Sequence, residues 1–481
     1  MVNRCSLAAF LAAAAFSMGS CGGPPVVSPG PTSAGTAPSV AVATASDATP
    51  AATAPPTATA PPTAAGPTDW PTYHGDALRT GQAAGFPSPA GGLAQAWSAA
   101  LDGAVYGQPL GVRGMVIAAT ENDSVYALDP TSGRVVWRRH LGEPVSLSTL
   151  PCGNIDPLGI TGTPVYDAAT GSLFVVAELS GPQHVLFALD AVSGAVRWSR
   201  VVDLPGDDPR THQQRAALAV GSGHVYVGFG GLAGDCGQYT GKVVGVSTSD
   251  SGATIAYLVP VAREGAVWAP GGPVVDGAGN LYVSVGNGSS TTVYDGSDSV
   301  LELSPALRLE SRFAPATWAQ DNASDADLGS LSPVLVAGGW VLIAGKSGTG
   351  YVLRQGALGG IGGQVSAAPV CAAFGGAAVS GSTVYVPCSD GVRRIDIRSG
   401  GLIHVAWRTG SGANGPPVLG GGAVFSLATG GGQLFALSPA TGGTVASIAV
   451  GPLPHFASPS LWNGLVLVGT LRGVTAVTPR P

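Results

Sequence analysis

Side chains suited to binding a small molecule stand just before the short apolar strands that the sequence predicts. Aromatic, amide, hydroxyl and cationic groups occupy these positions: Tyr106, Thr161, His212, Gln214, Arg215, Trp268, Ser330, Asn414, His455 and Phe456. Around one concavity, such groups would bind a small molecule or a peptide. The leading candidates are Tyr106, His212, Gln214, Arg215, Trp268 and Asn414. The alternative is that they fill a channel and satisfy one another's hydrogen bonds. No catalytic residue is predicted.

The cysteines are the next candidates for chemistry. Apart from Cys5 and Cys21 near the N-terminus, the chain has four: Cys152, Cys236, Cys371 and Cys388. An even number in an exported protein favours two disulfides, and three pairings are open. We expect Cys371 to pair with Cys388, on the first two strands of one sheet, and Cys152 to pair with Cys236. No Cys-x-x-Cys occurs and no His stands at ligand spacing to a Cys, so no metal site is predicted.

Two further motifs carry weak signals. Gly345-Lys-Ser347 resembles the end of a phosphate-binding loop, but the upstream glycine is replaced by Trp340 and no helix is predicted after it. We interpret it as a glycine turn between strands. Residues 321–327, with three Asp and one Asn, offer oxygen ligands for Ca²⁺ without the alternation of a known calcium loop. We interpret that segment as a solvated connection.

A repeated hairpin organises the elements that must position these residues. A short strand, an Asp or Ser, a turn closing on Gly and a second strand recur at 125–137, 186–198 and 434–442, with Trp at the end of the first two. Weaker copies bring the total to eight, with register residues 40 to 61 positions apart: Leu128, Leu189, Val246, Leu303, Leu353, Ile395, Leu437 and Val477. A period of about 40–50 residues with several strands per unit indicates a β-propeller.

The predicted fold is therefore all-β, a single eight-bladed propeller. Each blade is expected to open after a small residue, often followed by Pro, at Gln108-Pro-Leu110, Thr163-Pro-Val165, Ala217-Leu218, Gly272-Pro-Val274, Ser332-Pro-Val334, Ala368-Pro-Val370, Pro416-Pro-Val418 and Ser458-Pro-Ser460. The last blade lacks its final strand. We expect the N-terminal residues 94–101 to supply it and so close the ring without an open edge.

Composition agrees with this fold class and excludes some partners. The chain has 481 residues, of which 45% are hydrophobic and only 10% charged, and it contains 74 Gly. That suits a large, turn-rich β protein. The net charge of -6 gives no electrostatic basis for binding nucleic acid or an anionic membrane surface.

The N-terminal residues have the pattern of an export signal followed by a tether. In residues 1–21, Arg4 precedes a short apolar stretch, and residues 17–21 resemble a bacterial lipobox ending at the lipidated Cys21. The alternative is an ordinary signal peptide with a chance Cys. Residues 22–67 are mostly Ala, Pro, Thr, Ser, Val and Gly, which predicts a disordered tether. The propeller would then occupy 68–481.

Residues 69–81 read Asp-Trp-Pro-Thr-Tyr-His-Gly-Asp-Ala-Leu-Arg-Thr-Gly and resemble the opening segment of quinoprotein-type propellers. With the Ala-Leu-Asp…Gly…Trp hairpins, the chain is identified as a member of the pyrroloquinoline-quinone-like repeat β-propellers. The resemblance implies the fold and leaves activity open, because enzymes and non-enzymatic scaffolds share the repeat. The family's dehydrogenases use a disulfide between adjacent cysteines, a stacking Trp and Ca²⁺. This chain has no adjacent cysteines and no Cys-x-x-Cys-His haem motif, so we expect neither the quinone nor Ca²⁺ as a cofactor.

Two classes of function follow. The first is a cell-envelope lipoprotein whose head, outside the cytoplasm, binds an envelope protein or a small ligand at the channel mouth. It resembles the propeller lipoprotein of the outer-membrane barrel-assembly machinery, which binds partners without catalysis. The second is a quinone-dependent oxidoreductase of the periplasm or cell surface. The absence of adjacent cysteines favours the first, and the sequence does not identify the partner.

Overall fold

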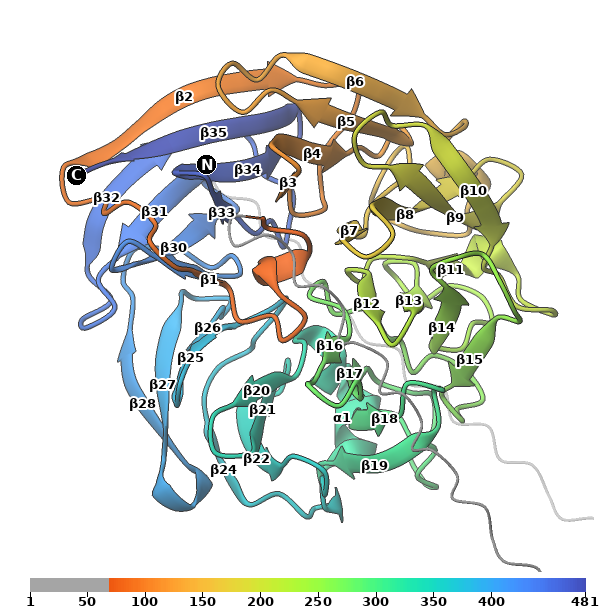
Figure 1. Cartoon of the computed structure of the whole chain (residues 1–481). Helices are drawn as coiled ribbons and strands as arrows, with labels where there is room; N and C mark the ends of the chain where they lie inside the picture. Colours follow the sequence, from red (N-terminus) through yellow and green to blue (C-terminus); the bar gives the residue numbers. More distant parts are fainter. Residues whose placement is uncertain (1–68) are drawn as a thin grey trace, which may run out of the picture. The chain divides into compact units, whose positions relative to one another are not determined.

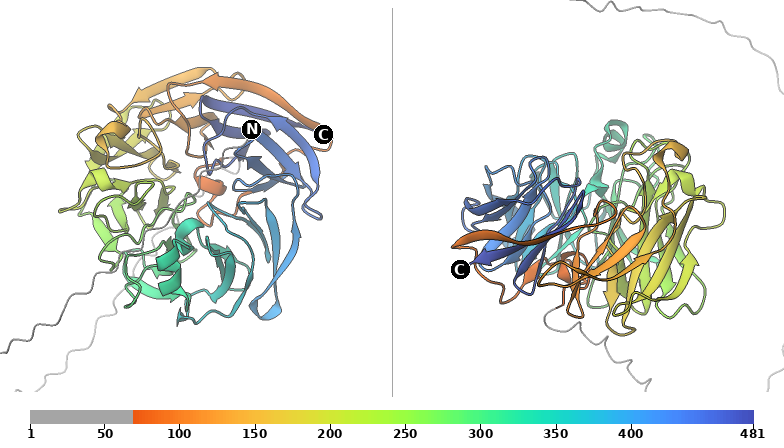
Figure 2. Two further views of the ribbon diagram at one scale, coloured as in Figure 1. Left: turned by 180° about the vertical axis from the view of Figure 1, so that it is seen from behind. Right: turned by 90° about the horizontal axis from the view of Figure 1, so that it is seen from above.

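Eight sheets of four or five strands stand radially around a common centre in the computed structural model, which describes residues 69–481 (Figures 1 and 2). The predicted all-β eight-bladed propeller is thus confirmed. The expected signal peptide, Cys21 and the tether lie outside the described residues. Between residues 69 and 481, no helix has the length and apolar character needed to cross a bilayer.

We number the blades in chain order. Blade 1 contains β3 (Leu110–Val112), β4 (Met115–Ala119), β5 (Ser124–Leu128) and β6 (Val135–His140). Blade 2 contains β7 (Val165–Asp167), β8 (Ser172–Leu179), β9 (Gln183–Asp190) and β10 (Val196–Val201). Blade 3 contains β11 (His212–Gln213), β12 (Ala219–Gly221), β13 (His224–Gly231), β14 (Lys242–Ser247) and β15 (Ile255–Leu258). Blade 4 contains β16 (Val274–Val275), β17 (Leu281–Val285), β18 (Ser299–Leu303), β19 (Leu309–Ala314) and β23 (Gly360–Ile361).

The second half of the ring repeats this plan. Blade 5 contains β20 (Val334–Val336), β21 (Trp340–Ala344), β22 (Thr349–Arg354) and β24 (Ser366–Pro369). Blade 6 contains β25 (Ala378–Ser380), β26 (Thr383–Val386), β27 (Arg393–Arg398) and β28 (Leu402–Arg408). Blade 7 contains β1 (Gln82–Ala83), β29 (Val418–Gly420), β30 (Ala423–Ala428), β31 (Gln433–Leu437) and β32 (Thr444–Ala449). Blade 8 contains β33 (Ser460–Trp462), β34 (Leu465–Thr470), β35 (Gly473–Arg480) and β2 (Gly92–Ala100).

Short helices connect some of these strands. One α-helix is described, α1 (Trp318–Ser324), between blades 4 and 5. The 3-10 turns are η1 (Tyr73–Gly75), η2 (Leu147–Thr149), η3 (Pro209–Thr211), η4 (Leu328–Ser330) and η5 (Ser399–Gly401). The core lies between adjacent sheets. Every residue of the middle strand β5 is buried, whereas the outer strand β6 alternates between more and less exposed residues.

The ring is closed by residues near the two ends of the described chain. Strand β2 pairs antiparallel with β35, from Gly92 opposite Arg480 to Ala100 opposite Gly473. The prediction that residues 94–101 complete the last blade is therefore confirmed. Strand β1 adds a short parallel strand beside β29 of blade 7.

The predicted start of blade 6 is wrong. Ala368 and Pro369 belong to β24, the outer strand of blade 5, where Ala368 lies opposite Gly350 of β22. Blade 6 begins later, at Ala378 of β25, which has no preceding Pro. In most other blades the small-Pro pattern stands just before the first strand, near the ring centre. Here the same pattern pairs with the edge of β22 and becomes the outer strand of blade 5.

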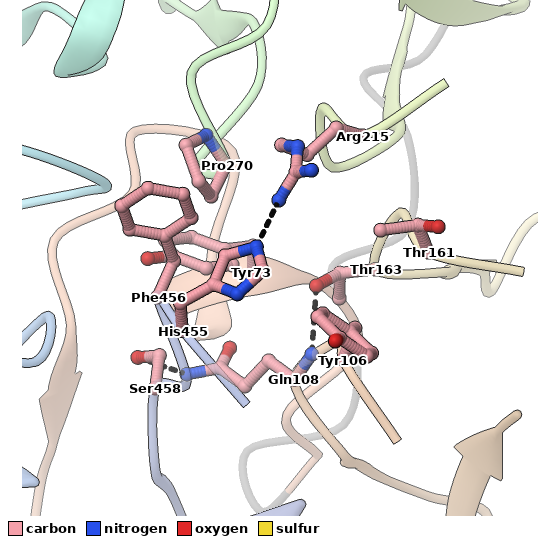
Figure 3. Close-up of a pocket in the computed structure, with 10 residues that line it drawn as sticks. All are labelled: Tyr73, Tyr106, Gln108, Thr161, Thr163, Arg215, Pro270, His455, Phe456 and Ser458. Carbon is pink, nitrogen blue, oxygen red and sulfur yellow. Dashed lines mark hydrogen bonds between the residues drawn. The ribbon is translucent and has the colours of Figure 1, made fainter. Parts of the chain in front are cut away.

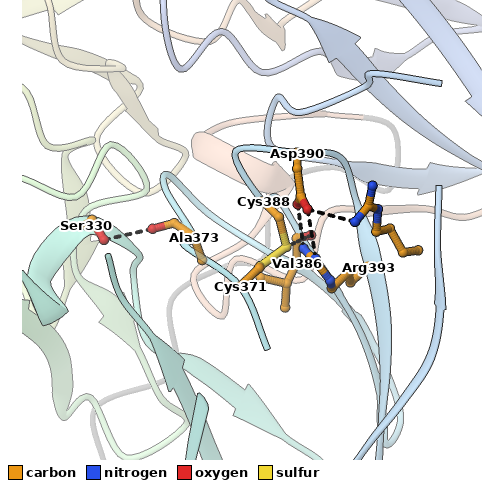
Figure 4. Close-up of a disulfide and its surroundings, with 8 residues drawn as sticks. Ser330, Cys371, Ala373, Val386, Cys388, Asp390 and Arg393 are labelled. Carbon is orange, nitrogen blue, oxygen red and sulfur yellow. Dashed lines mark hydrogen bonds and ion pairs between the residues drawn. A yellow bond between two sulfur atoms is a disulfide. The ribbon is translucent and has the colours of Figure 1, made fainter. Parts of the chain in front are cut away.

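Two disulfides form, with the pairing that the sequence favoured. Cys152 is joined to Cys236, with Cα atoms 6.0 Å apart, and Cys371 to Cys388, with Cα atoms 5.7 Å apart. These separations lie within the usual range for a bridge. The placement of the second bridge was wrong, because Cys371 follows β24 and Cys388 follows β26 (Figure 4). The bridge fastens the connection between blades 5 and 6 to blade 6.

Residues 69–81, which we call the plug, lie at the centre of the ring, where the orange segment containing η1 is seen in Figures 1 and 2. Main-chain hydrogen bonds join the plug to the first strands of several blades: Trp70 with Gly111, Pro71 with Tyr166, Ala77 with Val275, Thr80 with Val379 and Gly81 with Leu419. The buried Arg79 guanidinium donates to the carbonyls of Leu218 (2.8 Å) and Tyr73 (3.1 Å). The plug therefore bonds the inner ends of the blades to one another.

The repeated Gly and Trp link successive blades. Gly133, Gly194 and Gly442 have φ of +70°, +68° and +72°. A Cβ added at these glycines would lie 2.5–2.6 Å from a ring carbon of Trp97, Trp137 and Trp407 respectively, each on the outer strand of the preceding blade. Trp97 Nε1 also donates to the carbonyl of Pro130 at 2.7 Å. The Gly of the hairpin motif thus contacts the Trp of the neighbouring blade. Glycine is required there because φ is positive and because a Cβ would clash with the Trp ring.

An ionic cluster is buried between blades 2 and 3. His184 on β9 lies between two carboxylates, with Nδ1 2.7 Å from Asp203 Oδ1 and Nε2 3.4 Å from Glu178 Oε2. Burial acts to lower the pKa of His184, but the charge of Glu178 and the hydrogen bond to Asp203 outweigh it and raise the pKa to about 9. Burial raises the pKa of Glu178. His184 therefore carries a positive charge at neutral pH.

Replacing Gly194 tests the docking contact. Gly194→Ala should lower the free energy of unfolding by about 2–4 kcal/mol, because it adds a steric clash with Trp137 to the strain of positive φ. Gly114→Ala is the control, since Gly114 has φ of +77° but no atom within 4 Å of an added Cβ. It should lose only about 1 kcal/mol. Urea unfolding followed by circular dichroism measures both, and equal losses would contradict the contact.

The His184 cluster should make stability depend on pH. The pKa of His184 is higher in the folded chain, about 9, than the ordinary 6.5, so its stabilisation is complete below about pH 6.5 and is lost as pH rises through about 9. His184→Gln should cost on the order of 2 kcal/mol near pH 6 and much less near pH 10. The control is His224→Gln, which replaces a histidine at a more exposed position. Its effect on stability should depend less on pH. A cost independent of pH would refute the charged state of His184.

Candidate functional site

A cavity of about 480 Å³ lies near the ring centre, and we call it the central cavity. Four aromatic residues besides His455 form part of its wall: Tyr239, Trp268, Phe374 and Phe456. Phe456 lies 5.9 Å from Trp268 and 5.9 Å from Phe374, measured between ring centroids. The charged lining consists of Arg215, Asp235, Asp325, Asp327 and Lys346, and the amide lining includes Asn154, Gln213 and Asn287. This volume and this mixture of rings and polar groups are typical of small-molecule sites.

Two kinds of connection supply these side chains. Arg215, Trp268, Phe374 and Phe456 lie in segments that precede the first strand of a blade. Others follow the second strand of a blade: Asp235 after β13, Asn287 after β17 and Lys346 after β21. Both kinds of segment end near the ring centre, so they meet although they are far apart in the sequence.

Arg215 lies between the central cavity and a smaller one. Its Nη1 donates to Nε2 of His455 at 2.9 Å (Figure 3). Its Nη2 donates to Gln213 Oε1 at 3.3 Å. Burial and the Arg215 charge lower the pKa of His455 to about 4, so the imidazole is neutral and accepts this bond. Burial also lowers the pKa of Arg215, while the charge of the more distant Glu121 acts to raise it. Within residues 69–481, no carboxylate lies at ion-pairing distance from Arg215.

The smaller cavity, of about 20 Å³, has room for one water molecule. Its walls include Tyr106, Thr161, Arg215, His455, Phe456 and, from the plug, Tyr73 (Figure 3). Gln108 holds this region together, because its main-chain N–H donates to Thr163 Oγ1 at 2.8 Å and its Nε2 donates to Ser458 Oγ at 3.0 Å. Arg215, His455 and Phe456 line both cavities. The plug thus lies beyond the smaller cavity.

A paired cluster occupies another part of the central cavity. The Lys346 ammonium lies 2.7 Å from Asp325 Oδ1 and 3.4 Å from Asp327 Oδ2. Trp268 Nε1 donates to Asp327 Oδ2 at 2.9 Å, and the main-chain N–H of Gly329 donates to Asp327 Oδ1 at 2.9 Å. Burial raises the pKa of Asp327, against the charge of Lys346. Burial lowers the pKa of Lys346, but the charges of Asp327 and Asp325 outweigh it and the net change is upward.

The structure brings together some of the residues that the sequence singled out. Arg215, Trp268, His455 and Phe456 line the central cavity, and Tyr106 and Thr161 line the smaller one. His212, Gln214 and Asn414 line neither cavity. His212 Nδ1 bonds the carbonyl of Asp208 at 3.0 Å, Gln214 Nε2 donates to the carbonyl of Ala216, and Asn414 Oδ1 accepts from the main-chain N–H of Thr429 at 3.1 Å. Gln213, the neighbour of Gln214, is the glutamine that lines the central cavity.

Several lining residues were not predicted, namely Asp235, Asn287, Asp325, Asp327 and Lys346. Three of them, Asp325, Asp327 and Lys346, belong to the two motifs that carried only weak signals in the sequence. Lys346 lies in the turn between β21 and β22, as expected, but its side chain enters the cavity. The interpretation of residues 321–327 as a solvated connection is wrong, because α1 covers Asp321 to Ser324 and the Asp327 side chain is only 3% exposed.

The site does not fit a calcium-bound quinone. Within residues 69–481, no three His, Cys, Asp or Glu side chains are grouped so as to hold a metal ion. Asp327, the buried carboxylate of the cavity, already accepts from Trp268 and Gly329 and faces the Lys346 ammonium. The disulfide near the cavity joins Cys152 and Cys236, which are 84 residues apart rather than adjacent. We therefore derive no step through a quinone.

The chain is similar in fold to dehydrogenases and to BamB. A quinohemoprotein alcohol dehydrogenase from Comamonas testosteroni has 19% identity and a TM-score of 0.64, with 85% of this chain and 80% of that chain covered. A europium-containing methanol dehydrogenase has 15% identity and a TM-score of 0.64, covering 85% and 98%. BamB from Moraxella catarrhalis has 17% identity and a TM-score of 0.54, covering 80% and 97%. At such identities the similarity establishes the fold alone.

Sequence comparison is more specific about the family. No curated protein sequence matches the chain. The family described as outer membrane protein assembly factor BamB matches residues 94–341, which is more than half of the 481 residues. Together with the eight blades and the repeated docking hairpin, this match shows that the chain belongs to the BamB family of pyrroloquinoline-quinone-like repeat β-propellers.

Proposed function

We propose that this protein is a binding propeller of the cell envelope, which holds a small ligand in the central cavity. The observation that carries the proposal is the cavity itself, about 480 Å³ in volume and lined by aromatic rings and by charged and amide groups. Rings supply apolar contact area, while the polar groups fix a ligand's orientation. Arg215, Trp268 and Phe456 are the residues predicted from sequence that we assign to ligand binding, with Tyr106 behind them in the smaller cavity.

The same proposal places the head outside the cytoplasm. Disulfides persist in oxidising compartments, and the chain forms two of them. Membership of a family described by an outer-membrane assembly factor agrees with that location. We propose that residues 1–21 are a lipoprotein signal peptide, that Cys21 carries the lipid, and that residues 22–67 tether the propeller of residues 68–481 to the membrane.

Family membership also supports a protein partner. The family description names an assembly factor, and BamB from Moraxella catarrhalis shares the propeller fold. An envelope protein could therefore bind the head, with the central cavity receiving one of its side chains or a separate ligand. A quinone-dependent oxidoreductase is less well supported, because the cavity's donor set does not fit Ca²⁺ and the chain has no adjacent cysteines.

Ligand binding is tested by screening small aromatic and charged compounds against the purified chain with a thermal-shift assay. Compounds that raise the melting temperature should bind about tenfold or more weakly to Trp268→Ala, because truncation removes the ring that a ligand would contact. Trp340→Ala is the matched control, since Trp340 lies on β21, outside the cavity lining. Binders that are equally affected by both substitutions, or by neither, would contradict a site at Trp268.

Lipid attachment is tested by metabolic labelling with a palmitate analogue in a bacterial host. The wild-type chain should be labelled and recovered with membranes, because acyl chains partition into the bilayer at about 0.8 kcal/mol per CH₂. Cys21→Ala should abolish the label, whereas Cys5→Ala should leave it intact. Equal labelling of the Cys21→Ala chain would refute the anchor.

The quinone alternative is tested by reconstitution. The purified chain is mixed with pyrroloquinoline quinone and Ca²⁺, and cofactor binding and dye reduction with alcohols and sugars are measured. We expect no turnover, because no three His, Cys, Asp or Glu side chains of residues 69–481 are grouped so as to hold the metal. Stoichiometric binding with turnover that disappears in Trp268→Ala would overturn this expectation.

A further inference from the structure

The charges that line the central cavity divide into paired and unpaired groups. Lys346 is paired with Asp325 and Asp327, and Asp327 has further hydrogen bonds to both of its oxygens. Arg215 and Asp235 differ from these three. Within residues 69–481, neither forms an ion pair, although each contributes to the lining of the same cavity.

The positively charged guanidinium of Arg215 has no carboxylate partner among residues 69–481. Its two hydrogen-bond acceptors among the described residues are neutral, the imidazole of His455 at 2.9 Å and the amide oxygen of Gln213 at 3.3 Å. The acidic group with the largest electrostatic effect on Arg215, Glu121, is held by hydrogen bonds from Gly159 and Thr161 instead. A guanidinium has five N–H donors in a planar fork that matches a carboxylate. Arg215 is therefore prepared to bind an anionic group.

Asp235 has the opposite charge on the same blade. It lies between β13 and β14, and its Oδ1 accepts a hydrogen bond from the Tyr239 hydroxyl at 2.5 Å. The neighbouring Arg263 forms its ion pair with Glu264, at 2.7 Å, and reaches only the main-chain oxygen of Asp235. The Asp235 carboxylate is thus available to a cation in the cavity.

Aromatic rings lie next to Arg215. The Arg215 guanidinium carbon is 5.7 Å from the centroid of Phe456, and Phe456 in turn contacts Trp268 and Phe374. A ligand bound at Arg215 would place its body against these rings. A ligand with only one charge would remove water from the second charged side chain without pairing it, which is unfavourable.

We propose that the central cavity binds a small zwitterion, a molecule with a carboxylate and a protonated amine on an apolar, ring-sized body. Arg215 binds the carboxylate, Asp235 attracts the amine, and Trp268, Phe374 and Phe456 contact the body. This inference rests on the proposed ligand-binding function and specifies its ligand class.

The test uses four probes of one size with the full chain, measured by isothermal titration calorimetry. They are 4-(aminomethyl)benzoate, which is a zwitterion, 4-methylbenzoate, 4-methylbenzylamine and 4-methylbenzyl alcohol. The zwitterion should bind about tenfold or more tightly than each of the other three, since each charged contact contributes about a factor of ten. This comparison needs no variant, so it remains decisive if a substitution prevents folding.

Variants then assign the two ends. Arg215→Gln should weaken the zwitterion and 4-methylbenzoate about tenfold without weakening 4-methylbenzylamine. Asp235→Asn should weaken the zwitterion and 4-methylbenzylamine without weakening 4-methylbenzoate. The exposed Arg134→Gln and Glu310→Gln serve as controls for charge and should change nothing. Circular dichroism confirms that each variant is folded.

The outcomes separate this inference from the proposed function. If the zwitterion binds no better than the singly charged probes, or if no probe binds, the zwitterion assignment is wrong. If other compounds still bind in a manner that depends on Trp268, the cavity remains a ligand site of a different class. If no compound depends on Trp268, both the assignment and the proposed function fail.

Discussion

The pairing of β2 with β35 is the interaction on which the ring depends. Without β2, blade 8 would consist of three strands and β35 would present an open edge to solvent. Trp97 lies on β2 and docks against Gly133 of blade 1, so the same strand that completes blade 8 also fixes the neighbouring blade. Because each sheet buries its faces only against its neighbours, loss of one junction would expose apolar residues on two blades.

Much of this fold could be predicted because its signals are local. The hairpins carry their turn chemistry in a few consecutive residues: the Asp190 carboxylate accepts from the main-chain N–H of Val192 and Ser193, and Gly194 supplies the positive φ. Eight copies then imply eight blades. The start of blade 6 could not be predicted in this way, because Ala368 and Pro369 have the local pattern of a first strand. Their assignment was decided by the unpaired edge of β22, which is a property of the folded sheet.

The site was predictable only in part, for a related reason. Arg215 and Trp268 were found because they precede first strands, whose inner ends meet at the centre. Which side of a short strand faces the cavity depends on register, and β11 presents Gln213 rather than Gln214. Lys346 and Asp327 come from weak motifs 19 residues apart. Their significance arises only from their contact in space, which neither motif contains.

The plug determines whether a ligand can pass through the centre of the propeller. Three of its residues are almost fully buried, with Tyr73 at 2%, His74 at 0% and Arg79 at 4% exposure. The main-chain hydrogen bonds of the plug occupy the edges of first strands that would otherwise line a central channel. The plug therefore closes the central channel of the propeller at one end. A molecule bound in the central cavity cannot pass the plug, so it must leave by the opening through which it entered.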